Sequence, residues 1–181
     1  MNIGIFNFIH QFVGRSFWLD AAMIFFALYF PYILGITALV LPLFEKRWRL
    51  RWLFYFELIS AAILSRGILT EIVRYFYIHP RPFDYFHFTP LIPESGNSFP
   101  SGHAAFFFAI AIIILFWKPK WGWFFIGSAV VLSLARIYVG VHWPLDIIGG
   151  MIIGLISGFT VYYLFGKIYS KIRSQKQAEI S

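Results

Sequence analysis

Residues 98–117 read SFPSGHAAFFFAIAIIILFW, a short polar motif that leads directly into an apolar segment. Ser101 is a typical N-cap residue, and Gly102 leaves a backbone N–H uncovered beside it, so we expect a helix to begin here. The free N–H groups of a helix N-terminus bind anions, and His103 in the first turn would face the same position. The stretch therefore predicts an apolar helix with an anion site at its start. An ordinary helix cap followed by an interfacial histidine is the alternative.

The composition of the whole chain places this helix in a membrane. Hydrophobic residues make up 60% of the 181 residues and charged residues 13%, which is about half the charged share typical of soluble domains. A soluble fold of this size could not bury so much apolar surface, whereas a bilayer is a natural solvent for it. The chain contains no cysteine, which excludes disulfides and thiolate metal sites. We therefore predict one domain over residues 1–181, an all-α polytopic bundle.

Five segments are apolar and long enough to cross a bilayer, given that a transmembrane helix needs roughly 20 residues. They are residues 21–44, 52–75, 101–117, 122–138 and 147–166. The segment Ile3–Val13 is too short to cross, and its large apolar side chains recur at helical spacing, so residues 1–17 are predicted to form an interfacial amphipathic helix. A sixth, distorted span that includes this segment is the alternative. Residues 167–181 are predicted to form a cytoplasmic tail.

The basic residues predict how the bundle is oriented in the membrane. Most of them lie in three regions outside the spans: Lys46, Arg47, Arg49 and Arg51, then Lys118 and Lys120, then Lys167, Lys171, Arg173 and Lys176. By the positive-inside rule these regions face the cytoplasm, so residues 76–100 and 139–146 face outward. The net charge of +7 is thus a topology signal with contact to anionic lipids, and nucleic acid is not an expected partner.

Two arginines lie where the positive-inside rule does not explain them. Arg74 and Arg81 are seven residues apart, at the outer end of the second span and in the loop that follows. A helix returns to nearly the same face after seven residues, and Pro80 and Pro82 would end that helix. Two converging guanidiniums offer planar forks of donors that suit one phosphate. Two arginines that snorkel to the membrane surface are the alternative.

The second outer connection contains a histidine and a carboxylate at helical spacing. His142 and Asp146 are four residues apart, and Arg136 precedes them. A carboxylate that accepts one imidazole N–H fixes the tautomer and makes the other nitrogen a better nucleophile. An interfacial ion pair is the structural alternative. Since all three motifs are predicted on one side of the membrane, together they indicate a phosphate cradle with an acid/base pair.

In these residues the sequence resembles the type 2 phosphatidic acid phosphatase (PAP2) superfamily. Its pattern is a basic residue, six spacers and Arg-Pro, then Pro-Ser-Gly-His, then Ser-Arg, five spacers, His, three spacers and Asp. Here the pattern covers residues 74–146, but Arg74 replaces the usual lysine and Ala135 the serine before Arg136. Arg74 keeps the positive charge of the lysine but presents a planar fork of donors, so the geometry of its contact changes. Ala135 cannot make any hydrogen bond that the serine makes in relatives, which would leave Arg136 with less support. Three segments are most similar to small bacterial undecaprenyl-diphosphate phosphatases: Arg81–Phe83, Leu91–Pro93 and Ser98–Pro100.

The resemblance implies a role for each motif residue. His142 attacks the terminal phosphorus, Asp146 orients His142, and His103 first protonates the leaving oxygen and then activates water. The phosphate-binding residues are Arg74, Arg81, Ser101, Gly102 and Arg136. No metal ion and no cofactor is implied, and the partners are a lipid phosphate substrate and the bilayer.

The family pattern leaves the lipid open. Undecaprenyl diphosphate is the first choice, and phosphatidylglycerol phosphate, phosphatidate and lipid A phosphate are alternatives. A phosphotransferase that passes the phosphoryl group from His142 to an alcohol would carry the same motifs. A transporter is suggested by charges inside the second span, but the short spans show no inverted repeat. Nothing in the sequence indicates an oligomeric state.

Two further patterns predict structure rather than chemistry. Glycines recur every four residues in the last span and predict close helix packing; they are Gly150, Gly154 and Gly158. In the second span, Glu71 is expected to pair with Arg74, three residues away. Glu57 and Arg66 lie on opposite faces of the helix and need other partners, and Glu57 is a candidate for a polar cavity in the substrate path.

Overall fold

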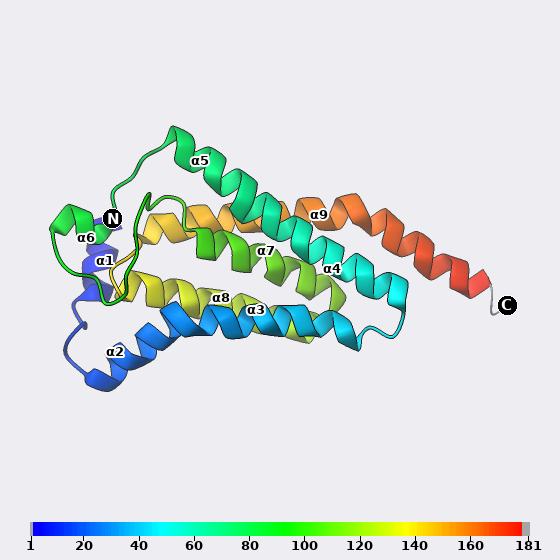
Figure 1. The fold of residues 1–181 in the computed structure, drawn as a ribbon, viewed down its shortest axis with the longest axis horizontal. Coiled ribbons are helices and arrows are strands. Elements are labelled where there is room, and N and C mark those ends of the chain that lie inside the picture. The colour runs from blue at the N-terminus through cyan, green and yellow to red at the C-terminus, as the bar shows by residue number, and fades with distance from the viewer. Residues whose placement is uncertain (1, 179–181) are drawn as a thin grey trace.

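The protein is a bundle of long helices whose connections gather at its two ends (Figure 1). The computed structural model describes the backbone of residues 2–178 and the side chains of residues 2–166. Within these residues every regular element is a helix, which confirms the all-α prediction. The basic side chains predicted to mark the cytoplasmic tail, Lys167, Lys171, Arg173 and Lys176, lie outside the described side chains.

Two of the long rods are composite. The first consists of α2 (Phe17–Ile24), the π-helical turn η1 (Phe25–Tyr29), α3 (Phe30–Val40) and the 3-10 turn η2 (Leu41–Phe44). The second consists of α4 (Trp48–Ala62), the π-helical turn η3 (Ile63–Leu69) and α5 (Thr70–Phe76). Turns of π-helix inside longer helices often occur at functional sites, because they rotate side chains out of the regular helical register.

Three further helices complete the bundle: α7 (Gly102–Trp117), α8 (Pro119–Tyr138) and α9 (Pro144–Ala178). Most side chains of α7 are buried, and this helix packs against α4, α8 and α9. Pro119 and Pro144 stand in the first turns of α8 and α9, where a missing N–H costs nothing. The short α6 (Pro82–Phe86) lies in the loop between α5 and α7.

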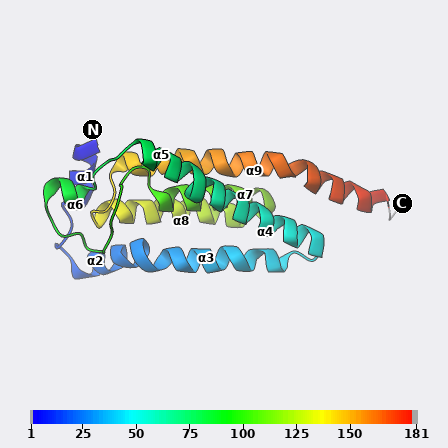
Figure 2. The ribbon, with the colours of Figure 1, turned by 45° about the horizontal axis from the view of Figure 1, so that its top comes forward.

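Four of these rods are long and apolar enough to cross a membrane: Phe17–Phe44, Trp48–Phe76, Pro119–Tyr138 and Pro144–Gly166. The shorter α7 has 16 residues, about 24 Å at 1.5 Å per residue, and runs from one end of the bundle to the other beside them (Figure 2). Each of the five predicted spans thus corresponds to a helix. The fourth span is longer than predicted, because α8 already begins at Pro119.

The N-terminal segment forms the separate helix α1 (Asn2–His10), whose nine residues are far too few to cross a bilayer. The alternative of a sixth span is therefore wrong. The predicted apolar side of this helix exists, but it packs onto the protein: Phe6 is buried and its ring lies 5.1 Å from that of Trp143. His10 Nδ1 lies 2.8 Å from the carbonyl oxygen of Tyr138. The helix thus covers the end of the bundle where α8 finishes and α9 begins.

The glycine repeat of the last span lies against α7, which confirms the predicted close packing. A Cβ added at Gly154 would come within 2.6 Å of the Ala105 carbonyl oxygen, and one at Gly158 within 2.7 Å of the Ile112 Cβ. A Cβ at Gly150 would collide with the Ser101 carbonyl oxygen. The two helices are therefore in backbone contact along this face, without intervening side chains.

We expect Gly154→Ala to destabilise the protein by roughly 1–3 kcal/mol, since overpacking against a backbone atom cannot be relieved by turning a side chain. Gly166→Ala is the matched control, because a Cβ there meets nothing within 4 Å and alanine favours helix. The measurement is the apparent melting temperature of each variant in detergent. Equal melting temperatures for the two variants would contradict the close contact between α7 and α9.

The buried carboxylate of the second rod lies far from the sequence motifs. Glu57 is 1% exposed and accepts a 2.7 Å hydrogen bond from Trp117 Nε1, at the last residue of α7. This is the opposite end of α7 from the Pro-Ser-Gly-His motif, so Glu57 does not line a cavity near that motif. The predicted pair of Glu71 and Arg74 is present, with 3.5 Å between its atoms.

Candidate active site

The three sequence motifs meet at one end of the bundle. Their residues come from five segments of the chain, namely the end of α5, the first outer loop, the start of α7, the end of α8 and the start of α9. Arg74 Nη2 donates to the Pro100 carbonyl at 3.1 Å, which ties the end of α5 to the start of α7. The Ser101 N–H donates to the Asp146 carbonyl at 2.9 Å, which ties α7 to α9. Arg81 Nη1 donates to the Val141 carbonyl at 2.8 Å, so the first outer loop contacts the second.

The N-terminus of α7 stands at the centre of this region. Ser101 has extended backbone angles and is buried, and its Oγ accepts a 3.4 Å bond from the Ala104 N–H, so it is the predicted N-cap. In the part of the chain that the structure describes, the backbone N–H groups of Gly102 and His103 have no partner. They can therefore donate to an anion bound at the start of the helix.

Arg81 is fixed in place by backbone carbonyls rather than by acidic side chains alone. It is 2% exposed, and besides Val141 its guanidinium bonds Gly96 at 3.0 Å and Ser95 at 3.1 Å. Burial lowers the pKa of Arg81, and the nearby Glu94 carboxylate opposes this change. A guanidinium whose position is already set by the loop can bind an anion without first having to be ordered.

Arg136 is held by a backbone carbonyl and by a carboxylate. The carbonyl is that of Ala27, in the π-helical turn η1. Arg136 Nη1 donates to that oxygen at 3.4 Å, and Nη2 pairs with Glu94. Arg136 therefore keeps two partners even though Ala135 replaces the serine of the family pattern.

Glu94 is a member of the site that sequence reasoning missed. One of its carboxylate oxygens pairs with Arg136 and the other lies 3.7 Å from Arg81 Nη2. The carboxylate thus stands between two buried arginines, where an anionic ligand would bind. The outer loop that carries the motif arginine contains two acidic residues, Asp84 and Glu94, and nothing in the local sequence distinguishes the second as a partner of the arginines.

The histidine and carboxylate of the third motif are in contact. His142 Nδ1 lies 3.4 Å from Asp146 Oδ2, which leaves Nε2 free to act as a nucleophile. The same oxygen accepts a 2.7 Å bond from the Trp143 N–H and a bond from the Ser98 hydroxyl, so the carboxylate is fixed from three sides. Burial, together with Arg136 and Arg81, holds the pKa of His142 well below its usual range. The imidazole is therefore neutral at physiological pH, as a nucleophile must be.

Two more residues contact Asp146 without having been assigned a role. Ser98 was quoted as part of a motif but not as a partner of the carboxylate. His79 Nδ1 lies 3.7 Å from Asp146 Oδ1, on the opposite side from His142. Both residues come from the long outer loop, 48 and 67 positions before Asp146 along the chain, so no local spacing could have predicted these contacts.

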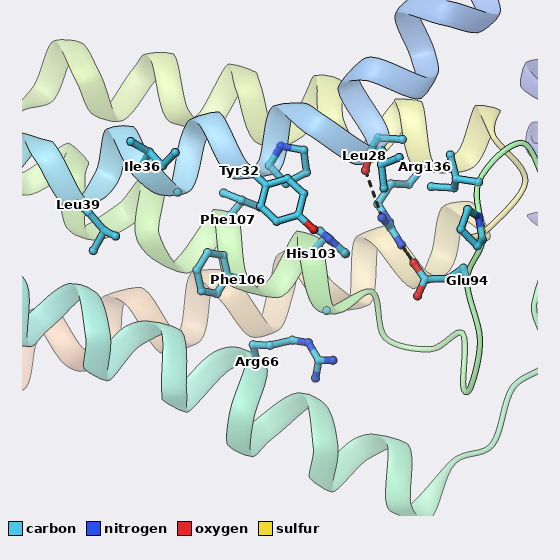
Figure 3. A pocket seen from close by; sticks show the side chains of 16 residues that line it. Leu28, Tyr32, Ile36, Leu39, Arg66, Glu94, His103, Phe106, Phe107 and Arg136 are labelled. Atoms are coloured by element: carbon cyan, nitrogen blue, oxygen red, sulfur yellow. Dashed lines mark hydrogen bonds and ion pairs between the residues drawn. The ribbon is translucent and has the colours of Figure 1, made fainter.

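A cavity of about 570 Å³ opens beside His103 (Figure 3). At one end it is lined by polar side chains, namely His103, Arg136, Glu94 and Arg66. Away from them it follows the apolar side chains of α3 and α7, namely Ile36, Leu39, Phe106 and Phe107, and Figure 3 draws the hydroxyl of Tyr32 beside His103. Such a shape accepts an amphipathic molecule with an anionic head and an apolar chain. His142 is 1% exposed and does not line the cavity, so a phosphate reaches it only after the surrounding groups rearrange.

Among the described residues, no three side chains of His, Cys, Asp or Glu are grouped as metal ligands would be. The positive charge of the site comes from arginines. Guanidiniums bind and neutralise phosphate oxygens without a metal ion.

Comparisons with known proteins agree with this geometry. The sequence pattern of the PAP2 superfamily matches residues 54–170. The chain is 31% identical to "Undecaprenyl-diphosphatase BcrC" of Bacillus subtilis (strain 168) over 163 residues, which is 90% of this chain and 83% of that protein. The crystal structure of Aquifex aeolicus LpxE has a TM-score of 0.75 with 30% identity and covers 90% of this chain and 94% of its own. A PAP2 type phosphatidylglycerolphosphate phosphatase from Bacillus subtilis has a TM-score of 0.60 with 26% identity, over 91% and 86% of the two chains.

Proposed function

Because the chain belongs to the PAP2 superfamily, we propose that it hydrolyses undecaprenyl diphosphate to undecaprenyl phosphate and orthophosphate, through a phosphohistidine intermediate. In coarser terms it is an integral membrane phosphatase that acts on lipid phosphates. The observation that carries the proposal is the buried pair of His142 and Asp146, which lies beside Arg81 and Arg136 at the start of α7.

In the first half-reaction the lone pair of His142 Nε2 forms a bond to the terminal phosphorus. The bond from this phosphorus to the bridging oxygen breaks, and the lipid monophosphate leaves with a proton from His103. Asp146 stabilises the positive charge that develops on the His142 ring. Arg74, Arg81 and Arg136, together with Ser101 and the Gly102 N–H, bind the three equatorial oxygens as their charge redistributes.

In the second half-reaction a water molecule attacks the phosphorus of the phosphohistidine. His103 takes a proton from this water, the phosphorus–nitrogen bond breaks, and its electron pair returns to His142 Nε2. Orthophosphate leaves, and both histidines regain their starting protonation states. The position of His103 in the first turn of α7, beside the cavity, supports this double role.

The site is proposed to face the extracytoplasmic side of a bacterial inner membrane, with α7 as a fifth crossing helix. The basic connections around Arg49 and Lys118 lie at the other end of the bundle, and the positive-inside rule places them in the cytoplasm. The amphipathic cavity supports a lipid substrate whose chain stays in the bilayer while its head group reaches the arginines.

The decisive experiment is phosphate release by the purified protein in detergent from a panel of lipids. The panel holds undecaprenyl diphosphate, phosphatidylglycerol phosphate, phosphatidate and lipid A phosphate, with and without an alcohol acceptor lipid. We expect the highest kcat/KM for undecaprenyl diphosphate, no transfer to the acceptor, and no loss of activity in EDTA, because arginines neutralise the phosphate. A higher kcat/KM for a monophosphate lipid would overturn the substrate assignment, and inactivation by EDTA would overturn the metal-free mechanism.

A further inference from the structure

Four arginines, one more than the three basic residues of the family pattern, lie around the first turn of α7. Arg81 and Arg136 lie on one side of it and share the carboxylate of Glu94. On the other side, Arg66 and Arg74 both contact one carboxylate oxygen of Glu71. The site therefore contains two pairs of arginines, and in each pair one carboxylate stands between the two guanidiniums.

Arg66 lies directly over the first turn of α7. A Cβ added at Gly102 would lie 2.6 Å from Arg66 Cδ and 3.0 Å from its Cζ, so the side chain of Arg66 would have to shift if one were present. The π-helical turn η3 carries Arg66. Figure 3 shows its side chain reaching from that rod toward the start of α7, on the opposite side from Arg136 and Glu94.

Arg81 and Arg66 lie in different parts of the site. Arg81 bonds the carbonyl of Val141, the residue next to His142, so it serves the phosphate that is attacked. Arg66 lines the polar end of the cavity together with His103, Arg136 and Glu94, next to the apolar residues of α3, and the proposed function places the leaving group and its chain in this cavity. An arginine at this position would contact the part of the substrate that links the attacked phosphorus to the lipid chain.

We propose that Arg66 binds the lipid-side phosphate of a diphosphate substrate and thereby selects lipid diphosphates over lipid monophosphates. This inference rests on the proposed function and specifies how the same site recognises its substrate class. A lipid monophosphate has only an alkyl oxygen at this position, which offers no charge for the guanidinium to pair with. While the bond to the terminal phosphorus breaks, negative charge develops on the lipid-side phosphate before the proton of His103 is fully transferred, and Arg66 stabilises that transient charge. Glu71, which is half exposed, pairs with Arg66 in the structure.

The test compares two substrates that share one short chain, farnesyl diphosphate and farnesyl monophosphate. We expect Arg66→Gln to lower kcat/KM for the diphosphate by roughly 10- to 100-fold, the range of a lost charge-assisted hydrogen bond, and to change that for the monophosphate by less than about threefold. Arg66→Lys keeps the positive charge but loses the planar pair of donors. Its kcat/KM for the diphosphate is expected to lie between those of Arg66→Gln and the wild type. Arg49→Gln, an exposed arginine at the far end of the same rod, is the matched control and should change neither value.

An equal loss on both substrates, or no loss on either, would overturn the assignment of Arg66. If Arg66→Gln lowers the melting temperature, Arg66→Lys decides the matter, because a charge-dependent preference for the diphosphate must survive in it at least in part. Failure of the proposed function has a different signature, since the wild-type protein would then release no phosphate from farnesyl diphosphate. Inhibition provides a second readout: Arg66→Gln should weaken inhibition by inorganic pyrophosphate more than inhibition by orthophosphate.

Discussion

His142→Ala is expected to abolish phosphate release, with a loss of roughly 10⁴-fold or more, as is found when the nucleophile of a covalent mechanism is removed. The Asp146 carboxylate cannot replace it, because this carboxylate is engaged by the Trp143 N–H and the Ser98 hydroxyl. The variant should remain folded, since alanine removes a neutral ring that is buried beside charged groups and leaves the other bonds of Asp146 in place.

Two measurements check this prediction. Phosphate release reports turnover, and an alkaline quench after mixing with substrate labelled in its terminal phosphate traps phosphohistidine in the wild type but not in His142→Ala. His87→Asn is a suitable control: His87 is exposed and has a φ of 56°, which asparagine tolerates better than most residues. Labelled protein in His142→Ala, or retained turnover, would identify a different nucleophile.

His103→Ala is expected to lower turnover of a lipid monophosphate by roughly 10²- to 10⁴-fold, the range of lost general acid–base catalysis. The leaving alkoxide of a monophosphate is strongly basic and needs the proton of His103. The leaving group of a diphosphate is a phosphate, which is far less basic, so the loss on the diphosphate should be smaller. Arg66→Gln is expected to show the reverse, with the larger loss of activity on the diphosphate.

The same variant should also accumulate the intermediate. Without His103 no base activates the water of the second half-reaction, so labelled phosphohistidine should build up when the diphosphate is the substrate. Quantifying it after an alkaline quench, in wild type and variant, measures this. Equal losses on both substrates without accumulation would show that His103 is neither the acid nor the base.

Much of the fold follows from local sequence, because apolar runs of this length form helices in a bilayer whatever surrounds them. The N-cap at Ser101 and the approach of Arg74 to Glu71 are equally local. The meeting of the motifs could be predicted too, since spans that alternate in direction bring the two outer loops to the same end.

Contacts between distant segments could not be predicted in this way. The bond from Arg136 to the Ala27 carbonyl joins residues 109 positions apart. It depends on how the π-helical turn of the first rod packs against α8. The position of Glu94 between two arginines, and that of Arg66 against Gly102, likewise depend on how separate rods pack. Helical periodicity contains no information about that packing, so Arg66 looked like an isolated charge in a span.

The glycine contact between α7 and α9 determines how an enzyme of this kind can diversify. Because the two backbones touch, the helices that carry His103 and Asp146 form one inflexible frame, and a mutation there disturbs catalysis directly. Contacts between α3 and α7 are far less extensive, so side chains on α3 can be exchanged while that frame stays unchanged. Substitutions on α3 alone can therefore change the specificity for longer, shorter or branched lipid chains without changing the catalytic mechanism.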